Sequence, residues 1–68
     1  MRAADLTQAI VYRIDGIPDV LDAEYGRWHY IGTLEDEARF VDPQGMAVTL
    51  EVDRLTEVER GHLVYKSD

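Results

Sequence analysis

The most regular hydrophobic pattern in the chain lies in residues 46–52, where apolar side chains occupy every second position. Met46, Val48, Leu50 and Val52 alternate with Ala47, Thr49 and Glu51. A period of two is typical of a β-strand that buries one face and leaves the other in water. We therefore predict a strand here, with its four even-numbered side chains reaching the core together.

A turn signal directly precedes this strand. In the sequence Asp42-Pro43-Gln44-Gly45, aspartate suits the first position of a type I turn, proline the second and glycine the fourth. The turn follows a short apolar run, so the two segments predict a β-hairpin. We expect residues 38–41 to pair antiparallel with residues 46–49.

Two further segments favour strands by their residue types. Residues 27–34 are rich in aromatic and β-branched side chains and carry apolar groups on both alternating faces. Residues 62–66, with the sequence HLVYK, are short and β-rich. We predict a partly covered strand for the first segment and an edge or closing strand for the second.

The segment of residues 6–15 is ambiguous. Asp5 and Gln8 resemble a helix capping box, and Gly16 could follow the last residue of a helix. The interior argues for a strand, because Ile10, Val11 and Tyr12 would wrap apolar surface around much of a short helix. We favour the strand and retain an N-terminal helix over residues 6–15, packed on a β-meander, as the alternative.

The last undecided segment is DRLTEVERG, residues 53–61, which fits either a short helical turn or a strand that leads into a tight turn. We favour the helical turn. Five strands and one short helical turn then predict a mainly β fold, a small five-stranded antiparallel SH3-like barrel. Residues 1–68 are expected to form a single small domain.

The short chain limits the stability that one hydrophobic core can supply. With 68 residues, 46% of them hydrophobic, the chain can form a core, but it contains no cysteine and hence no disulfide. One core of this size rarely supplies more than about 3–5 kcal/mol. Binding to the folded state would add to that stability, so we expect a homodimer or another protein partner.

Charge narrows the choice of partner. The chain has 14 acidic against 7 basic residues, a formal net charge of −7. Such a surface repels phosphate backbones and anionic lipids, so we predict no direct binding to nucleic acid or membranes and favour a basic protein partner. The N-terminal residues lack a long apolar stretch, and we expect a cytoplasmic location.

No constellation of residues predicts catalysis. The chain has no cysteine, and its one serine, Ser67, is next to the last residue. His29 and His62 are far apart in sequence and are flanked by residues that suit strands better than a zinc site. The glycines form no phosphate-binding motif. We therefore predict a protein that is not an enzyme and has no metal or cofactor.

Two functional hypotheses remain. The first is a non-catalytic interaction module that self-associates or docks onto a larger protein through an aromatic edge formed by Tyr25, Trp28 and Tyr30. The second is an acidic, phage-type inhibitor that imitates nucleic acid and blocks a nucleic-acid-binding enzyme. Its carboxylates would include those of Glu35, Asp36 and Glu37.

The alternation in residues 46–52 can be tested by a pair of substitutions. We expect Val48→Asp to unfold the isolated domain, because it places a charge on the predicted core face. Thr49→Asp, on the opposite face, should cost little. Thermal melting of both variants checks the prediction, and comparable losses in melting temperature would contradict the alternation.

Overall fold

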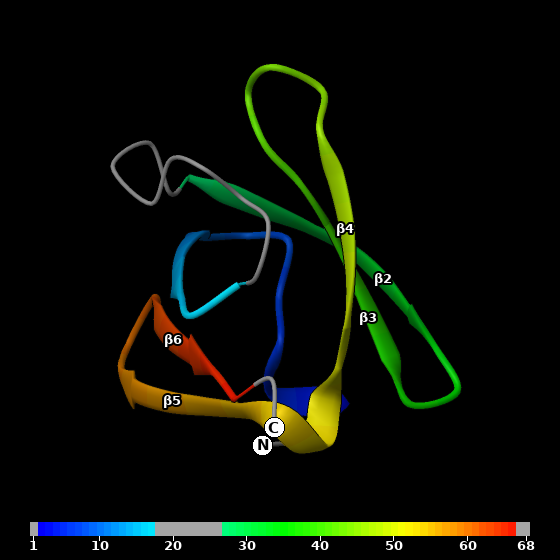
Figure 1. Ribbon diagram of the computed structural model, residues 1–68, viewed down its shortest axis with the longest axis vertical. Helices are drawn as coiled ribbons and strands as arrows, with labels where there is room; N and C mark the ends of the chain where they lie inside the picture. The colour runs from blue at the N-terminus through cyan, green and yellow to red at the C-terminus, as the bar shows by residue number, and fades with distance from the viewer. Residues whose placement is uncertain (1, 18–26, 67–68) are drawn as a thin grey trace.

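The computed structural model describes residues 2–17 and 27–66, which form one six-stranded β-sheet (Figure 1). The strands are β1 (Val11–Asp15), β2 (Trp28–Leu34), β3 (Glu37–Val41), β4 (Ala47–Glu51), β5 (Leu55–Glu59) and β6 (His62–Tyr65). Two single 3-10 turns accompany them, η1 (Ala3–Asp5) and η3 (Val52–Arg54). The strand order is β4-β3-β2-β1-β6-β5. The described residues contain no helix long and apolar enough to cross a membrane.

The mainly β class is confirmed, and the predicted barrel is corrected. The sheet has six strands rather than five, it is open rather than closed, and the pair β1–β6 is parallel while the other neighbours are antiparallel. The two edge strands of the sheet are β4 and β5. They are joined by η3, and Figure 1 shows them leaving it in different directions. An SH3-like arrangement stays a prediction.

β1 settles the ambiguity of residues 6–15 in favour of the strand, and the alternative helix is wrong. The strand buries Tyr12 and Ile14 and exposes the residues between and before them. Such alternation requires the period of two that the segment shows. The residues before β1 still contribute to the core, because Leu6 is buried and the Thr7 amide donates a hydrogen bond to the Tyr12 hydroxyl at 3.0 Å.

In β5 the structure contains the strand that residues 53–61 also fitted, and the favoured helical turn does not describe most of this segment. Residues 53–61 contain the expected helical turn only at their start, within η3, and continue as Leu55–Glu59 paired antiparallel with β6. Leu55 alone is buried in this strand. A bulge between Glu57 and Glu59 also shifts its register. Because the strand is an edge with one core contact, its sequence lacks the alternation that identifies the others.

The hairpin β3–β4 confirms the predicted turn and corrects its register. Gly45 has φ +89°, and its amide donates to the Asp42 carbonyl at 3.0 Å, as in a type I turn that ends in a left-handed residue. Gly45 adds one residue to the loop and shifts the pairing of the two strands by one residue, so Val41 lies opposite Ala47. Buried Phe40 then faces Val48 on the same side of the sheet.

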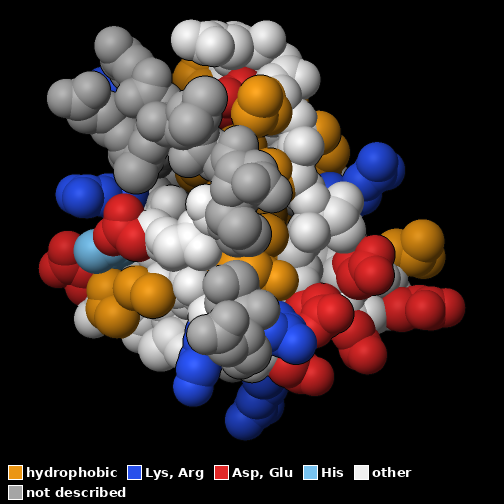
Figure 2. Space-filling model, viewed as in Figure 1, with side chains coloured by type: hydrophobic (Ala, Val, Ile, Leu, Met, Phe, Trp, Pro, Cys, Tyr) orange, Lys and Arg blue, Asp and Glu red, His pale blue; other side chains and the backbone are white. Residues whose placement is uncertain are grey.

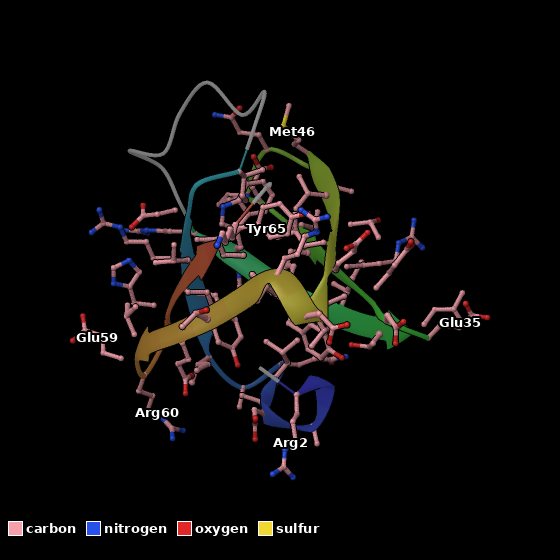
Figure 3. The ribbon with its side chains drawn as sticks, turned by 60° about the horizontal axis from the view of Figure 1, so that its bottom comes forward. Arg2, Glu35, Met46, Glu59, Arg60 and Tyr65 are labelled. Carbon is pink, nitrogen blue, oxygen red and sulfur yellow. The ribbon has the colours of Figure 1, made fainter. Side chains whose placement is uncertain are left out.

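Met46 differs from its prediction. Its side chain is 53% exposed, whereas Val48 packs against the core and Leu50 and Val52 are buried. Figure 3 shows Met46 at the tip of the β3–β4 hairpin. The core-facing pattern of β4 therefore begins at Val48.

The core lies on the inner face of the curved sheet and draws on every strand. Its buried members are Leu6, Tyr12, Ile14, Trp28, Ala38, Phe40, Leu50, Val52, Leu55 and Leu63. Phe40 lies at the centre of the aromatic packing in this core. The Tyr12 ring packs edge-on against it, with 6.0 Å between the two ring centroids. No described polar or charged side chain is buried.

The parallel pair β1–β6 joins the two halves of the sheet. Arg13 lies opposite His62 and Asp15 opposite Val64, and the Arg13 amide donates to the Gly61 carbonyl at 2.8 Å. Gly16 then leaves β1 with φ +88°, at a point where a Cβ would stand 2.3 Å from the Tyr65 carbonyl oxygen. Only glycine fits this contact without a backbone shift.

Two glycines with nearly the same positive φ allow this contact to be tested. We expect Gly45→Ala, at φ +89° with no atom within 4 Å of the new Cβ, to cost about 1–2 kcal/mol of left-handed strain. Gly16→Ala adds the collision with Tyr65 and should cost at least about twice as much. Urea unfolding of both variants gives the comparison. Equal losses would show that the contact at Tyr65 relaxes freely.

Candidate functional site

The predicted aromatic edge is largely part of the core. Trp28 is 2% exposed, and Tyr30 is partly buried, with its ring 5.6 Å from that of Phe40 and its hydroxyl hydrogen-bonded to Thr33. Tyr25 lies outside the described residues. Substitution of Trp28 would therefore test folding rather than docking. The aromatic residues supply no exposed docking surface within the described part of the chain.

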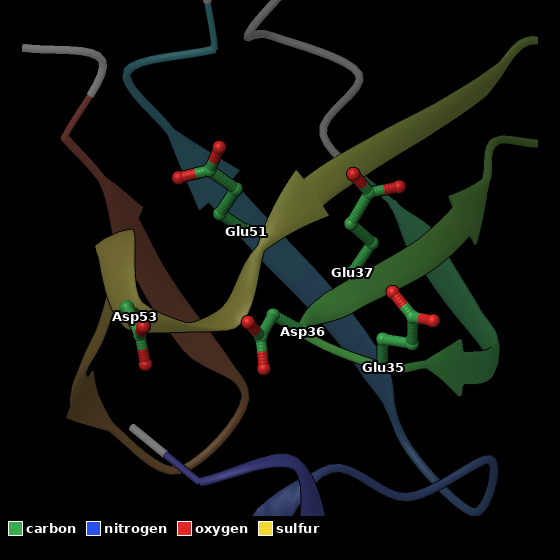
Figure 4. Close-up of a pocket in the computed structure, with 5 residues that line it drawn as sticks. All are labelled: Glu35, Asp36, Glu37, Glu51 and Asp53. Carbon is green, nitrogen blue, oxygen red and sulfur yellow. The ribbon is translucent and has the colours of Figure 1, made fainter.

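The predicted acidic residues, in contrast, are exposed and lie together. Glu35, Asp36 and Glu37 line a hollow of about 250 Å³ together with Glu51 and Asp53 (Figure 4). We call this group the acidic hollow. It lies at the end of β4, where Glu37 pairs directly opposite Glu51. Figure 2 shows acidic side chains gathered on this side of the molecule, with cationic side chains along one border.

Local structure brings the two acidic segments together. Glu35 and Asp36 form the two-residue turn between β2 and β3, and Glu35 has φ +57°, which is unusual for a residue other than glycine. The Asp36 carbonyl accepts a 2.8 Å hydrogen bond from the Val52 amide at the start of η3. The turn is thereby fastened beside Glu51 and Asp53.

The hollow is only partly neutralised. Arg54 Nε lies 2.8 Å from Glu51 Oε2, and this is the one ion pair found between the hollow and a described cation. Like charges that lie directly opposite each other on neighbouring strands are destabilising, which applies to Glu37 and Glu51. The arrangement therefore favours a positively charged group in the hollow.

The backbone of β4 adds a second feature. Antiparallel strands alternate between residue pairs that exchange two backbone hydrogen bonds and pairs that exchange none. At the ends of the β3–β4 ladder, the Asp42 amide donates to the Met46 carbonyl and the Val52 amide donates to the Asp36 carbonyl. The even-numbered residues of β4 therefore direct their backbone N–H and C=O groups towards β3 and form the hydrogen-bonded pairs.

The N–H and C=O groups of Ala47, Thr49 and Glu51 consequently point away from β3. β4 is the terminal strand of the sheet order, and the side chains of these three residues are exposed. The Glu51 carbonyl accepts the first hydrogen bond of η3, because Glu51 is the N-cap of that turn. The other outward-facing groups have no strand partner among the described residues, since β4 ends the sheet order. We call these outward-facing groups the free edge. It is regular, because the β3–β4 register has no bulge.

The opposite edge, β5, has the features by which proteins protect an edge strand. It is bulged between Glu57 and Glu59, and both side chains are charged and exposed. Figure 3 places Glu59 and Arg60 at one end of the molecule and Glu35 at the other. The free edge of β4 bears one charged side chain, Glu51, at the end that borders the acidic hollow.

A second polar cluster lies on the β1–β6 pair. His62 Nε2 is 2.6 Å from Asp15 Oδ2, and Arg13 Nε is 3.6 Å from Asp15 Oδ1. The hydrogen bond from His62, and then Arg13, lower the pKa of the Asp15 carboxyl below its usual 3.8. The ionised carboxylate therefore stabilises the fold above about pH 4, and this contribution is lost as pH falls through the lowered pKa.

This second cluster joins strands and offers little chemistry. Glu59 Oε1 lies 3.8 Å from His62 Nδ1, so the imidazole stands between two carboxylates. Among the described residues, no three histidine, aspartate or glutamate side chains form a group able to hold a metal ion. His29 lies apart from His62, on β2 opposite Val41. We assign the cluster to the pairing of β1 with β6.

Comparison of the chain with protein-family models, with curated proteins and with solved structures finds no match. Only geometry therefore supports a functional role for the acidic hollow and the free edge. Glu35, Asp36 and Glu37 were predicted as site residues from the sequence, whereas Glu51 and Asp53 were not predicted as their neighbours. The pairing of β3 with β4 was the available signal, since it places the two acidic segments side by side.

The repulsion inside the acidic hollow has a measurable effect on stability. We expect Glu37→Gln to raise the free energy of unfolding by about 0.2–1 kcal/mol at low salt, because it removes one of two opposed charges. Glu57→Gln is the matched control, since Glu57 lies opposite Leu63. The gain should shrink in high salt. Urea titrations at two salt concentrations measure it, and equal effects of both changes would contradict the repulsion.

Proposed function

We propose that the protein is a non-catalytic interaction module that docks onto a protein partner by accepting a strand at the free edge of β4. The observation that carries this proposal is the row of outward-facing backbone groups on Ala47, Thr49 and Glu51. An extended segment that pairs with such an edge extends the sheet through main-chain hydrogen bonds. Side chains beside the edge then select the partner.

The contrast between the two edges supports the choice of β4. Bulges and charges deter strand addition at β5, whereas β4 has a regular register and only one charged side chain. A protein that needed only to stay monomeric would be expected to protect both edges. The unprotected one is therefore the better candidate for a docking surface.

A second copy of the chain is one possible occupant of this edge. Antiparallel pairing of β4 with itself would satisfy the free backbone groups of both copies. It would also bring together two chains of net charge −7 with their acidic hollows nearby. The homodimer expected from chain length is thus proposed for high salt, where these charges are screened.

The acidic-inhibitor hypothesis remains as a second proposal, supported by the five carboxylates around one hollow. Such a protein would occupy the cationic groove of a nucleic-acid-binding enzyme through its charges alone. It would not need the backbone of β4. The joint change of Glu35, Asp36 and Glu37 to lysine should abolish this mode of binding.

Strand addition can be tested with two substitutions at one position. The amide of Thr49 faces the open edge, so Thr49→Pro removes a donor that the fold does not use, and proline is tolerated at such positions. We expect at least about fivefold weaker retention of the partner in affinity capture from the source cell, since one net hydrogen bond is worth about 1 kcal/mol and the ring also blocks approach. Thr49→Val keeps the amide and should retain the partner.

Circular dichroism and melting of both variants verify that they fold. A partner retained by Thr49→Pro but lost from the triple lysine variant would contradict strand addition and support the acidic inhibitor. Sedimentation of the wild-type protein at low and high salt tests the homodimer in the same preparations. A dimer that persists in Thr49→Pro would place self-association elsewhere.

A further inference from the structure

This inference rests on the proposed strand addition at β4 and concerns the chemistry of the partner. We infer that the free edge accepts an extended, basic protein segment that runs antiparallel to β4 and carries lysine or arginine opposite Glu51. Two features converge at that position. Glu51 belongs both to the free edge and to the acidic hollow.

The geometry of a sheet determines where the cation would lie. Residues directly opposite each other on paired strands project their side chains to the same face, with Cβ atoms about 4.5–5.5 Å apart. A residue opposite Glu51 would thus stand beside its carboxylate on the exposed face of β4. Glu37 lies opposite Glu51 on the other side. A cation at this position would relieve the repulsion between the two glutamates.

A second cation would fit two residues earlier in the partner segment. Because an antiparallel strand runs against β4, its earlier residues extend past Glu51 towards η3. Asp53 lies in that direction and lines the same hollow. The segment is therefore expected to carry basic residues at alternating positions near its N-terminal end.

The other positions along β4 favour different side chains. Thr49 lies opposite Arg39 on β3, so a cation beside Thr49 would meet a like charge. Ala47 lies opposite the partly buried Val41, which offers an apolar neighbour. At every second position, counted from its N-terminus, the partner segment is therefore expected to carry a cation, a second cation, a neutral residue and an apolar residue.

Charge repulsion disfavours the main competitors for this edge at low and physiological salt. A second copy would bring another seven net negative charges, and nucleic acid would bring phosphates, to a surface with five clustered carboxylates. A basic segment gains attraction from the same charges and is steered towards the edge over a Debye length of about 8 Å at physiological salt. A basic segment is accordingly the occupant that this surface fits.

A defined peptide tests the inference. The probe is acetyl-Thr-Arg-Thr-Arg-Thr-Thr-Thr-Val-Thr-amide, and the comparison peptide has glutamine in place of both arginines. Each is titrated into the ¹⁵N-labelled protein at low salt while amide resonances are followed. We expect both to shift the amides of Ala47, Thr49 and Glu51. The arginine peptide should bind about tenfold more tightly, which two exposed ion pairs together can supply.

Matched variants locate the preference. Glu37→Gln combined with Glu51→Gln should reduce the tenfold difference to about threefold, because Asp53 can still pair with the second arginine. Glu57→Gln combined with Glu59→Gln, on the other edge, should preserve the full difference. Thr49→Pro should weaken both peptides alike. Salt at about 0.5 M should also reduce the difference, because exposed ion pairs are screened.

The outcomes distinguish this inference from the proposal beneath it. Equal binding of both peptides at the free edge would overturn the basic partner and leave strand addition in place. Binding of the arginine peptide that Thr49→Pro does not affect, or no binding of either peptide at millimolar concentration, would overturn strand addition as well. Self-association through β4 at low salt that excludes both peptides would make a second copy the occupant.

Discussion

The parallel pairing of β1 with β6 is the interaction on which the sheet depends. β2, β3 and β4 lie on one side of β1, and β6 and β5 lie on the other, so β1 alone joins the two groups by strand pairing. Its buried Tyr12 and Ile14 also place it in the core. The pairing needs a glycine at position 16, where the backbone passes close to Tyr65. Without this junction, the two groups would be connected only by η3 and the loops.

The same arrangement determines which surfaces remain open. Since β1 and β6 lie in the interior of the sheet, the strands on either side of η3 become its two edges. One edge is bulged and acidic, and the other is regular with its free backbone groups ending beside clustered carboxylates. The docking surface that we propose is thus a consequence of strand order, and no single motif in the chain encodes it.

Local features were predictable from the sequence, and features that depend on distant pairing were not. The alternation around Leu50 and the turn after Asp42 identified the β3–β4 hairpin, because both are encoded within a few neighbouring residues. β5 was not favoured over a helical turn because only Leu55 contacts the core. Trp28 was assigned to a surface because an aromatic residue in a strand carries no local sign of which face is covered. Glu51 was not placed in the acidic hollow because the predicted β3–β4 register was off by one residue, which put Leu50 instead of Glu51 opposite Glu37.

The sequence separation of β1 and β6 has a consequence for folding kinetics. β2, β3 and β4 are connected by short turns, and hairpins of this kind form in about 1–10 μs. The β1–β6 ladder instead joins residues from opposite ends of the described chain, so its formation carries the entropy cost of closing a long loop. Long-range pairing of this kind slows folding. The β2–β3–β4 meander is therefore expected to form first. The pairing of β6 with β1 then limits the rate at which the native state is reached.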